Sequence, residues 1–181
     1  MFIQTEATPN PLTLKFIPGR TVLDTGTVFF TSAQDAKASP LAQALFAIDG
    51  VTAVFFGSDF ITVTRRESDG WDTLKPALLA AVMDHFLAGK PVMTGAATAQ
   101  STNDNDSEIV KQIRELIDTR VRPAVAMDGG DIVYRGFQDG IVQLELHGSC
   151  SGCPSSTMTL KNGIENMLKH YVPEVVAVEA V

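Results

Sequence analysis

The sequence predicts an α+β protein made of two small domains that each mix helices and strands. Both halves of the chain contain short runs of alternating apolar residues, typical of strands, and longer runs with helical apolar spacing. Residues 94–106 separate the halves with a small, polar stretch that has no aromatic residue and is typical of a linker. A chain of 181 residues suits two domains of this size.

The first expected domain covers residues 1–93 and contains strands and helices in alternation. The expected strands are residues 12–18, 27–30, 51–56 and 60–65, and the expected helices begin at Pro40 and near Asp72. Pro18-Gly19 predicts a turn between the first two strands, Asp49-Gly50 ends the first helix, and Gly89 ends the second. This half contains no cysteine and no catalytic grouping of polar residues.

The second expected domain covers residues 107–181 in the order helix, strand, strand, helix, strand. Ser107 or Asp106 is expected to cap the opening helix. Its apolar stripe comprises Ile109, Ile113, Leu116, Ile117 and Val121. Asp139-Gly140 predicts a tight hairpin between strands at 131–137 and 141–147. A second helix then runs to about Tyr171 and a strand closes the chain, which predicts an open mixed sheet with helices on one side.

Charge and hydropathy argue against two classes of partner. The net charge of −7 argues against nucleic acid, because binding phosphates needs a clustered basic surface. No apolar stretch approaches the roughly 20 residues of a membrane-spanning helix, so no membrane partner is expected. The first residues, MFIQTEATPN, resemble neither a signal peptide nor an Arg-rich transit peptide, and the expected location is the cytoplasm of a bacterium.

The two cysteines, Cys150 and Cys153, lie together in GSCSGCPSS, between an expected strand and an expected helix. Pro154 suits the first position of that helix, whose positive dipole end favours thiolates. Two thiolates at this spacing can bind one metal centre, and soft sulfur ligands select zinc, copper(I) or an iron–sulfur cluster. Because tetrahedral zinc and cubane clusters take four protein ligands, a site of thiolates alone requires a second copy of the chain.

The Cys-x2-Cys pattern alone leaves other functions open. One is a dithiol oxidoreductase, since thioredoxin-type motifs also lie at a helix start, although here a hairpin precedes the motif. Another is a zinc-bridged dimer with a structural role. His147 extends the pattern to H-x2-C-x2-C, but strand alternation places it on the polar face, where a hydrogen-bonding histidine is expected. No sequence pattern of an enzyme stands out, and no catalytic activity is expected.

Five further features have structural interpretations. Asp128-Gly129-Gly130-Asp131 is explained by two glycines with positive φ at a helix-to-strand turn, and it is also a candidate for lining the metal site. Met158 and Met167 have the helical spacing of core residues. His85 and His170 lie in the last turns of helices, where a positive charge suits the helix dipole.

The chain resembles known proteins in both halves. Residues 128–175 resemble the C-terminal domain of NifU, as found in Nfu-type iron–sulfur scaffold and carrier proteins, along DGGDIVYRGFQDGIVQLELHGSCSGCPSSTMTLKNGIENMLKHYVPEV. The first half is similar to the N-terminal domain of Nfu proteins along IQTEATPNPLTLKFIPG and SPLAQALFAIDGVTAVFFGSDFITVTR. Leu12 departs from this pattern, where a polar residue is expected, without bearing on the site.

The resemblance implies a protein that accepts an assembled cluster, usually [4Fe–4S] held between two subunits, and delivers it to apo-proteins. It implies Cys150 and Cys153 as the ligands and a homodimer that depends on the cluster. The implied partners are upstream assembly factors and apo iron–sulfur proteins. The first domain, which has no thiol to offer, is then expected to recognise clients or the cluster donor.

Overall fold

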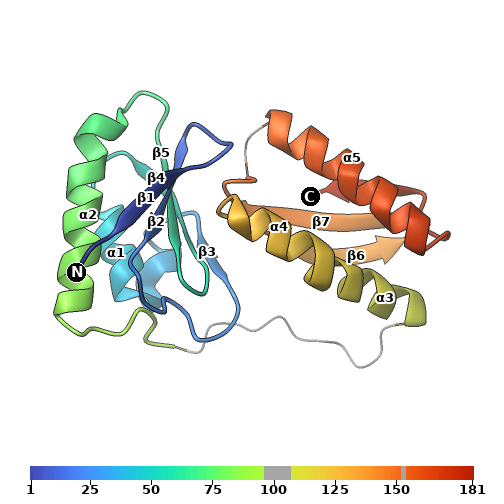
Figure 1. Cartoon of the computed structure of the whole chain (residues 1–181), viewed down its shortest axis with the longest axis horizontal. Helices are drawn as coiled ribbons and strands as arrows, with labels where there is room; N and C mark the ends of the chain where they lie inside the picture. The colour runs from blue at the N-terminus through green and yellow to red at the C-terminus, as the bar shows by residue number, and fades with distance from the viewer. Residues whose placement is uncertain (96–106, 152–153) are drawn as a thin grey trace. The chain divides into compact units, whose positions relative to one another are not determined.

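The computed structural model describes residues 1–95, 107–151 and 154–181, with only the backbone at 154–156. The chain divides into two compact units, Met1–Gln100 and Ser101–Val181, and each has its own hydrophobic core (Figure 1). Both units mix helices and strands, which confirms the α+β class. Most of the linker expected at 94–106 lies outside the described residues.

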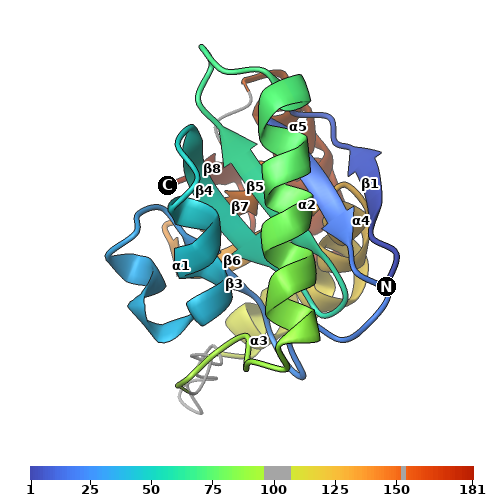
Figure 2. The ribbon, with the colours of Figure 1, turned by 90° about the vertical axis from the view of Figure 1, so that its left-hand side faces the viewer.

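The first unit is an antiparallel sheet covered on one face by helices. Its strands are β1 (Gln4–Ala7), β2 (Thr13–Ile17), β3 (Val28–Phe30), β4 (Val51–Phe56) and β5 (Ile61–Arg65), in the order β1-β2-β5-β4-β3. The helices are a 3-10 turn at Asp35–Ala38, α1 (Pro40–Phe46) and α2 (Trp71–Leu87). Figure 2 shows α1 and α2 on the same face of the sheet, where their apolar residues join the core.

Two features of this unit differ from the expectation. β1 was not predicted, because it is a short edge strand with mostly exposed residues and carries no apolar alternation. The turn at Pro18-Gly19 does not join neighbouring strands, since β5 lies between β2 and the β4-β3 pair. The sequence predicted a turn between these two strands but no pairing, and in the structure β2 pairs with β5 while β3 pairs with β4.

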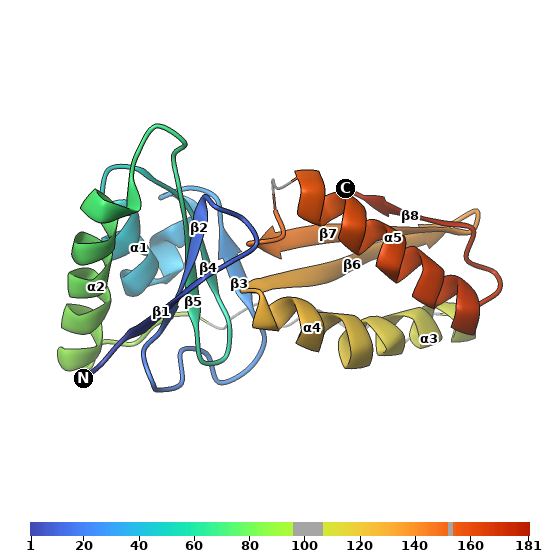
Figure 3. The same cartoon turned by 45° about the horizontal axis from the view of Figure 1, so that its top comes forward.

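The second unit has the predicted order of helix, strand, strand, helix, strand. Its opening helix is α3 (Glu108–Leu116), a π-helical turn (Ile117–Val121) and α4 (Arg122–Met127), followed by β6 (Gly130–Gln138), β7 (Ile141–Gly148), α5 (Pro154–Tyr171) and β8 (Ala177–Ala180). β6 and β7 pair antiparallel, and β7 and β8 pair parallel, so the sheet is mixed as expected. Figure 3 shows α3 and α4 continuing along one line, with α5 lying beside the same sheet.

The opening helix changes its winding where a proline enters it. The backbone N–H of Arg122 bonds to Ile117 O, five residues back, and Pro123 follows inside the first turn of α4. Proline has no N–H to donate and crowds the preceding turn, so the wider π turn gives it room. Ile113, Ile117 and Val121 of the predicted stripe remain buried through this change.

The hairpin of the second unit forms where the sequence predicts it. Asp139 has a φ of 53° and Gly140 a φ of 79°, and the flanking Gln138 and Ile141 are paired. Two consecutive positive φ values define the tight turn that suits the twist of antiparallel strands. This turn fixes the register of β7 against β6. The strand β7 ends at Gly148, two residues before Cys150.

Candidate metal centre

Cys150 lies in a tight turn directly after β7. Gly148 has a φ of 65°, and Ser151 N donates to Gly148 O at 3.1 Å, so the chain reverses here. The Cys150 side chain is only 4% exposed and belongs to the hydrophobic core of the unit. Cys153, the other predicted ligand, lies outside the described residues, and α5 begins at the next residue, Pro154. The structure therefore locates one of the two thiols and does not test their pairing.

The segment 128–131 packs directly against this turn. Ser149 N donates to Gly129 O at 3.3 Å, and the Ser149 hydroxyl donates to Asp128 O. Gly130 pairs with Gly148 at the start of the β6-β7 ladder. Residues 128–131 therefore lie beside Cys150. This agrees with the second interpretation of the Asp-Gly-Gly-Asp sequence, in which it lines the site.

The two glycines of this segment serve different purposes. Gly129 has a φ of 78°, as predicted for a helix-to-strand turn. Gly130 does not have a positive φ, so that part of the prediction is wrong. A Cβ atom at Gly130 would instead lie 2.5 Å from Cys150 Sγ. Gly130 is therefore required by the closeness of the thiol, which the sequence spacing did not reveal.

An ion pair between the partly exposed Arg122 and the buried Asp131 ties α4 to the start of β6. Arg122 Nε and Nη2 each donate to Asp131 at 2.8 Å, and Asp131 is 2% exposed. Asp131 Oδ1 also accepts the N–H of Ile132 at 2.8 Å. The hydrogen bond to Asp131 raises the pKa of Arg122 above its ordinary value, so the guanidinium remains charged. Sequence reasoning missed this pair, because only the fold brings the two side chains together.

His147 has a carboxylate partner, as expected of a hydrogen-bonding histidine. Its Nε2 lies 3.0 Å from Glu145 Oε1, and Arg135 also bonds to Glu145. Burial raises the pKa of Glu145, but the hydrogen bonds from His147 and Arg135 together outweigh it and leave the pKa below its ordinary value. Within residues 1–95, 107–151 and 154–181, no group of three or more His, Cys, Asp or Glu residues could hold a metal ion.

The structure corrects two other interpretations and confirms one. Met158 is 68% exposed, because the buried face of α5 follows Ile164 and Leu168 and Met158 lies on another side of the helix. Met167 packs on the core as predicted. His85 was expected to act as a cation at a helix end, but it is 4% exposed, and burial, with Lys90 nearby, lowers its pKa.

No helix among the described residues has the length and apolar character that crossing a membrane demands.

Comparison with known proteins gives matches to both halves of the chain. Residues 3–89 match the family model described as "Scaffold protein Nfu/NifU N terminal", and residues 113–179 match the model described as "NifU-like domain". A solution structure of a NifU-like protein from Saccharomyces cerevisiae matches at 23% identity and a TM-score of 0.49, covering 53% of this chain and 87% of its own.

Curated relatives match over the full length of the chain. The protein named "NFU1 iron-sulfur cluster scaffold homolog, mitochondrial", of Homo sapiens, is 55% identical over all of this chain and 72% of its own. "NifU-like protein 4, mitochondrial", of Arabidopsis thaliana, is 54% identical over 99% of this chain, which spans 65% of that relative's length.

These relatives contradict the expected location. The cytoplasm of a bacterium was inferred from the first ten residues and from a default for chains without a recognised targeting segment. The curated relatives are instead named as mitochondrial proteins of eukaryotes, so the expectation is wrong. With 55% identity to a relative of which it covers 72%, the chain belongs to the Nfu/NifU family of iron–sulfur cluster scaffold proteins.

Proposed function

We propose that this scaffold binds a [4Fe–4S] cluster between two copies of the chain, through Cys150 and Cys153 of each, and delivers it to apo-proteins. The observation that carries the proposal is the number of thiols. The chain has two cysteines, whereas a cubane cluster takes four cysteine ligands. Two copies together supply four thiolates, and the cluster is then cargo that both copies must release.

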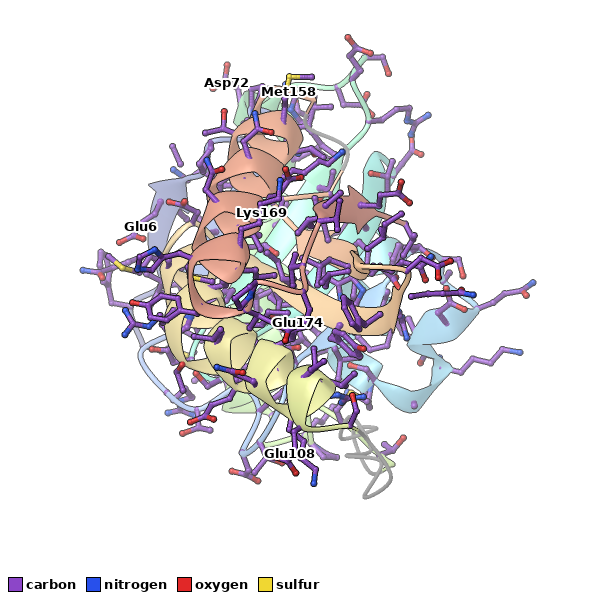
Figure 4. All side chains as sticks on the ribbon, turned by 90° about the vertical axis from the view of Figure 1, so that its right-hand side faces the viewer. Glu6, Asp72, Glu108, Met158, Lys169 and Glu174 are labelled. Atoms are coloured by element: carbon purple, nitrogen blue, oxygen red, sulfur yellow. The ribbon has the colours of Figure 1, made fainter. Side chains whose placement is uncertain are left out.

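The surface beside Cys150 supports an approach of a second copy. Met127 is 77% exposed and directly precedes Asp128, whose carbonyl oxygen binds the Ser149 hydroxyl. Met158 follows Thr157, whose hydroxyl donates to Cys150 O at 3.5 Å. Figure 4 shows Met158 projecting outward from α5. Exposed apolar side chains close to a site are typical of surfaces that a partner covers.

The two units have separate tasks in this proposal. Residues 107–181 hold the cluster, residues 94–106 link the units, and residues 1–93 recognise client proteins or the upstream donor. Every thiol of the chain lies in the second unit, which supports the assignment of the cluster to it. Linking the two tasks in one chain keeps the recognition unit at a high effective concentration near the cargo.

The dithiol oxidoreductase is less well supported than the scaffold. The burial of Cys150 does not separate the two functions, because an attacking thiol and a shared ligand both have to be accessible. The scaffold is favoured because the relatives are named as an iron–sulfur cluster scaffold homolog and a NifU-like protein. A zinc-bridged dimer would use the same four thiolates, but the relatives are named for iron–sulfur clusters.

Single cysteine variants test the ligands. Cys150→Ser and Cys153→Ser are each expected to lose stable cluster binding after anaerobic loading with iron and sulfide, because the chain has no spare thiol. Iron and sulfide analysis and visible absorption measure the loss, and circular dichroism checks that the fold persists. A full cluster retained by either variant would exclude ligation by the two cysteines, and a colourless dimer that contains zinc would favour the structural role.

A further inference from the structure

The position of Cys150 does not yet fit its proposed role. A ligand shared between two copies has to reach the surface, but the Cys150 side chain is nearly buried in the core of its own unit. A thiol in this role therefore has to move to the surface when a cluster is loaded. The residues around Cys150 show what holds it in its buried position.

Gly130 provides the space in which the thiol lies. A Cβ atom there would lie 2.5 Å from Cys150 Sγ, 3.0 Å from His147 O and 3.2 Å from Cys150 N. Because the φ of Gly130 is not positive, the backbone itself would accept a side chain. The shortest contact is with the Cys150 thiol, so an added methyl group would press on the thiol most strongly, and the backbone atoms His147 O and Cys150 N would also have to shift slightly.

Backbone bonds hold the two walls of this space together. Gly130 is paired with Gly148, and Ser149 bonds to the backbone of Asp128 and Gly129. The turn that contains Cys150 is therefore fixed directly onto the segment that contains Gly130.

The Arg122–Asp131 pair anchors that segment from the other side. Asp131 follows Gly130, and its two hydrogen bonds of 2.8 Å to Arg122 join the beginning of β6 to the first residue of α4. Paired bonds between a guanidinium and a carboxylate fix orientation as well as distance. The pair thus restrains both ends of the stretch that carries the Gly129 turn.

We propose that Gly130 forms a niche that stores the Cys150 thiol in the cluster-free protein, and that Arg122 and Asp131 are positioning residues that hold the niche in place. Loading a cluster draws the thiol out of the niche. This inference rests on the proposed role of Cys150 as a ligand. A stored thiol reacts slowly with alkylating agents, because reaction requires an accessible thiolate.

Alkylation of the cluster-free protein tests the niche. In a Cys153→Ser background Cys150 is the single thiol of the chain, so the rate of reaction with N-ethylmaleimide reports its exposure. The native rate is expected to be at least about tenfold below that of the same chain unfolded in urea, because reaction requires local opening. Gly130→Ala is expected to raise the native rate by about tenfold or more, since it expels the thiol.

Gly136→Ala is the matched control. Gly136 lies in the same strand, its φ is not positive, and the nearest atom to an added Cβ is the end of the Gln143 side chain at 3.3 Å. This variant is expected to leave the alkylation rate unchanged.

The ion pair is tested by a second set of variants. Arg122→Lys keeps the charge but cannot make two parallel bonds, so it is expected to raise the rate less than Arg122→Met. Arg135→Met, which breaks a half-exposed pair with Glu145, is expected to have no effect. Val178→Ala, a core substitution in β8, lowers the stability of the unit without touching the niche and separates general weakening from loss of positioning.

Two results would overturn the proposal. One is a native alkylation rate equal to that in urea, and the other is equal rates for Gly130→Ala and Gly136→Ala. If Arg122→Met lowers the unfolding midpoint but leaves the alkylation rate unchanged, the ion pair stabilises the unit and does not position the niche. None of these alkylation measurements involves a cluster. The proposed function is tested separately, by cluster loading of the Cys150→Ser and Cys153→Ser variants.

Discussion

At the scale of single residues, His85 shows how burial reverses the expected behaviour of a charged group. Its side chain is buried in the first unit, and its pKa lies below the ordinary value of 6.5, because burial and the nearby Lys90 disfavour the protonated form. Its Nε2 has no hydrogen-bond partner among the described residues. Folding therefore favours the neutral form of His85 over the protonated form.

We predict that the first unit loses stability as the pH falls below about 6.5. The unfolded chain binds a proton at His85 more readily than the folded chain, so the stability is complete above the unfolded pKa and decreases below it. Denaturant unfolding followed by the fluorescence of Trp71, the single tryptophan of the chain, reports this unit. His85→Leu is expected to flatten the dependence between pH 5 and 7, and an unchanged slope would assign it to other groups.

At the scale of elements, the β6-β7 hairpin sets where the cysteine turn begins. Its register depends on a turn in which both Asp139 and Gly140 have positive φ. Gly140 also faces a tight space, since an added Cβ would lie 2.6 Å from Val176 Cγ2. The turn therefore tolerates few residues at either position.

We predict that Asp139→Gly is tolerated and that Asp139→Val destabilises the second unit by about 1–2 kcal/mol, because a β-branched residue is strained at positive φ. Both tyrosines, Tyr134 and Tyr171, lie in the second unit, so its denaturant unfolding can be followed by tyrosine absorbance while Trp71 reports the first unit. A similar stability for the two variants would mean that the turn does not control the hairpin.

The elements that the sequence predicted well are those with local signals. The apolar stripe through Ile113, Ile117 and Val121 and the Asp139-Gly140 turn depend on neighbours in sequence, and both formed as expected. The edge strand β1 was not predicted, because an edge strand with exposed residues shows no alternation of apolar and polar residues. The π turn was not predicted either, since its apolar spacing still resembles that of an ordinary helix.

The surroundings of the site depended on contacts that no local pattern carries. Cys150 was recognised from its motif, but its burial and its closeness to Gly130, twenty positions earlier, follow from the β6-β7 register. Arg122 and Asp131 likewise meet only because α4 and β6 leave the Gly129 turn side by side. The sequence therefore predicted which residues are candidate metal ligands, but not the contacts that hold Cys150 in position.

In the whole molecule, the proposed dimer would be held by a cluster and by a small apolar surface. Met127 and Met158 are exposed in the single chain and lie beside residues that bond to the cysteine turn. A small contact of this kind suits a dimer that forms with its cargo and separates on delivery, because stable interfaces are larger.

We predict that Met127→Glu combined with Met158→Glu weakens the loaded dimer without lowering the stability of the single chain. Charges introduced at the boundary would repel each other across the two copies, whereas exposed positions tolerate them in the monomer. Sedimentation of the loaded protein over a range of concentrations measures the change. Leu87→Glu, an equally exposed position in the first unit, is the control, and equal effects of both changes would place the contact elsewhere.

The stoichiometry of the loaded protein shows whether two copies of the chain share one cluster. Light scattering combined with iron and sulfide analysis, after anaerobic loading of the full chain, gives mass and cluster content together. We predict a dimer with about four iron and four sulfide ions per two chains, because four thiolates surround one cubane. A monomer that carries a complete cluster would contradict it, since a single chain has only Cys150 and Cys153 to offer.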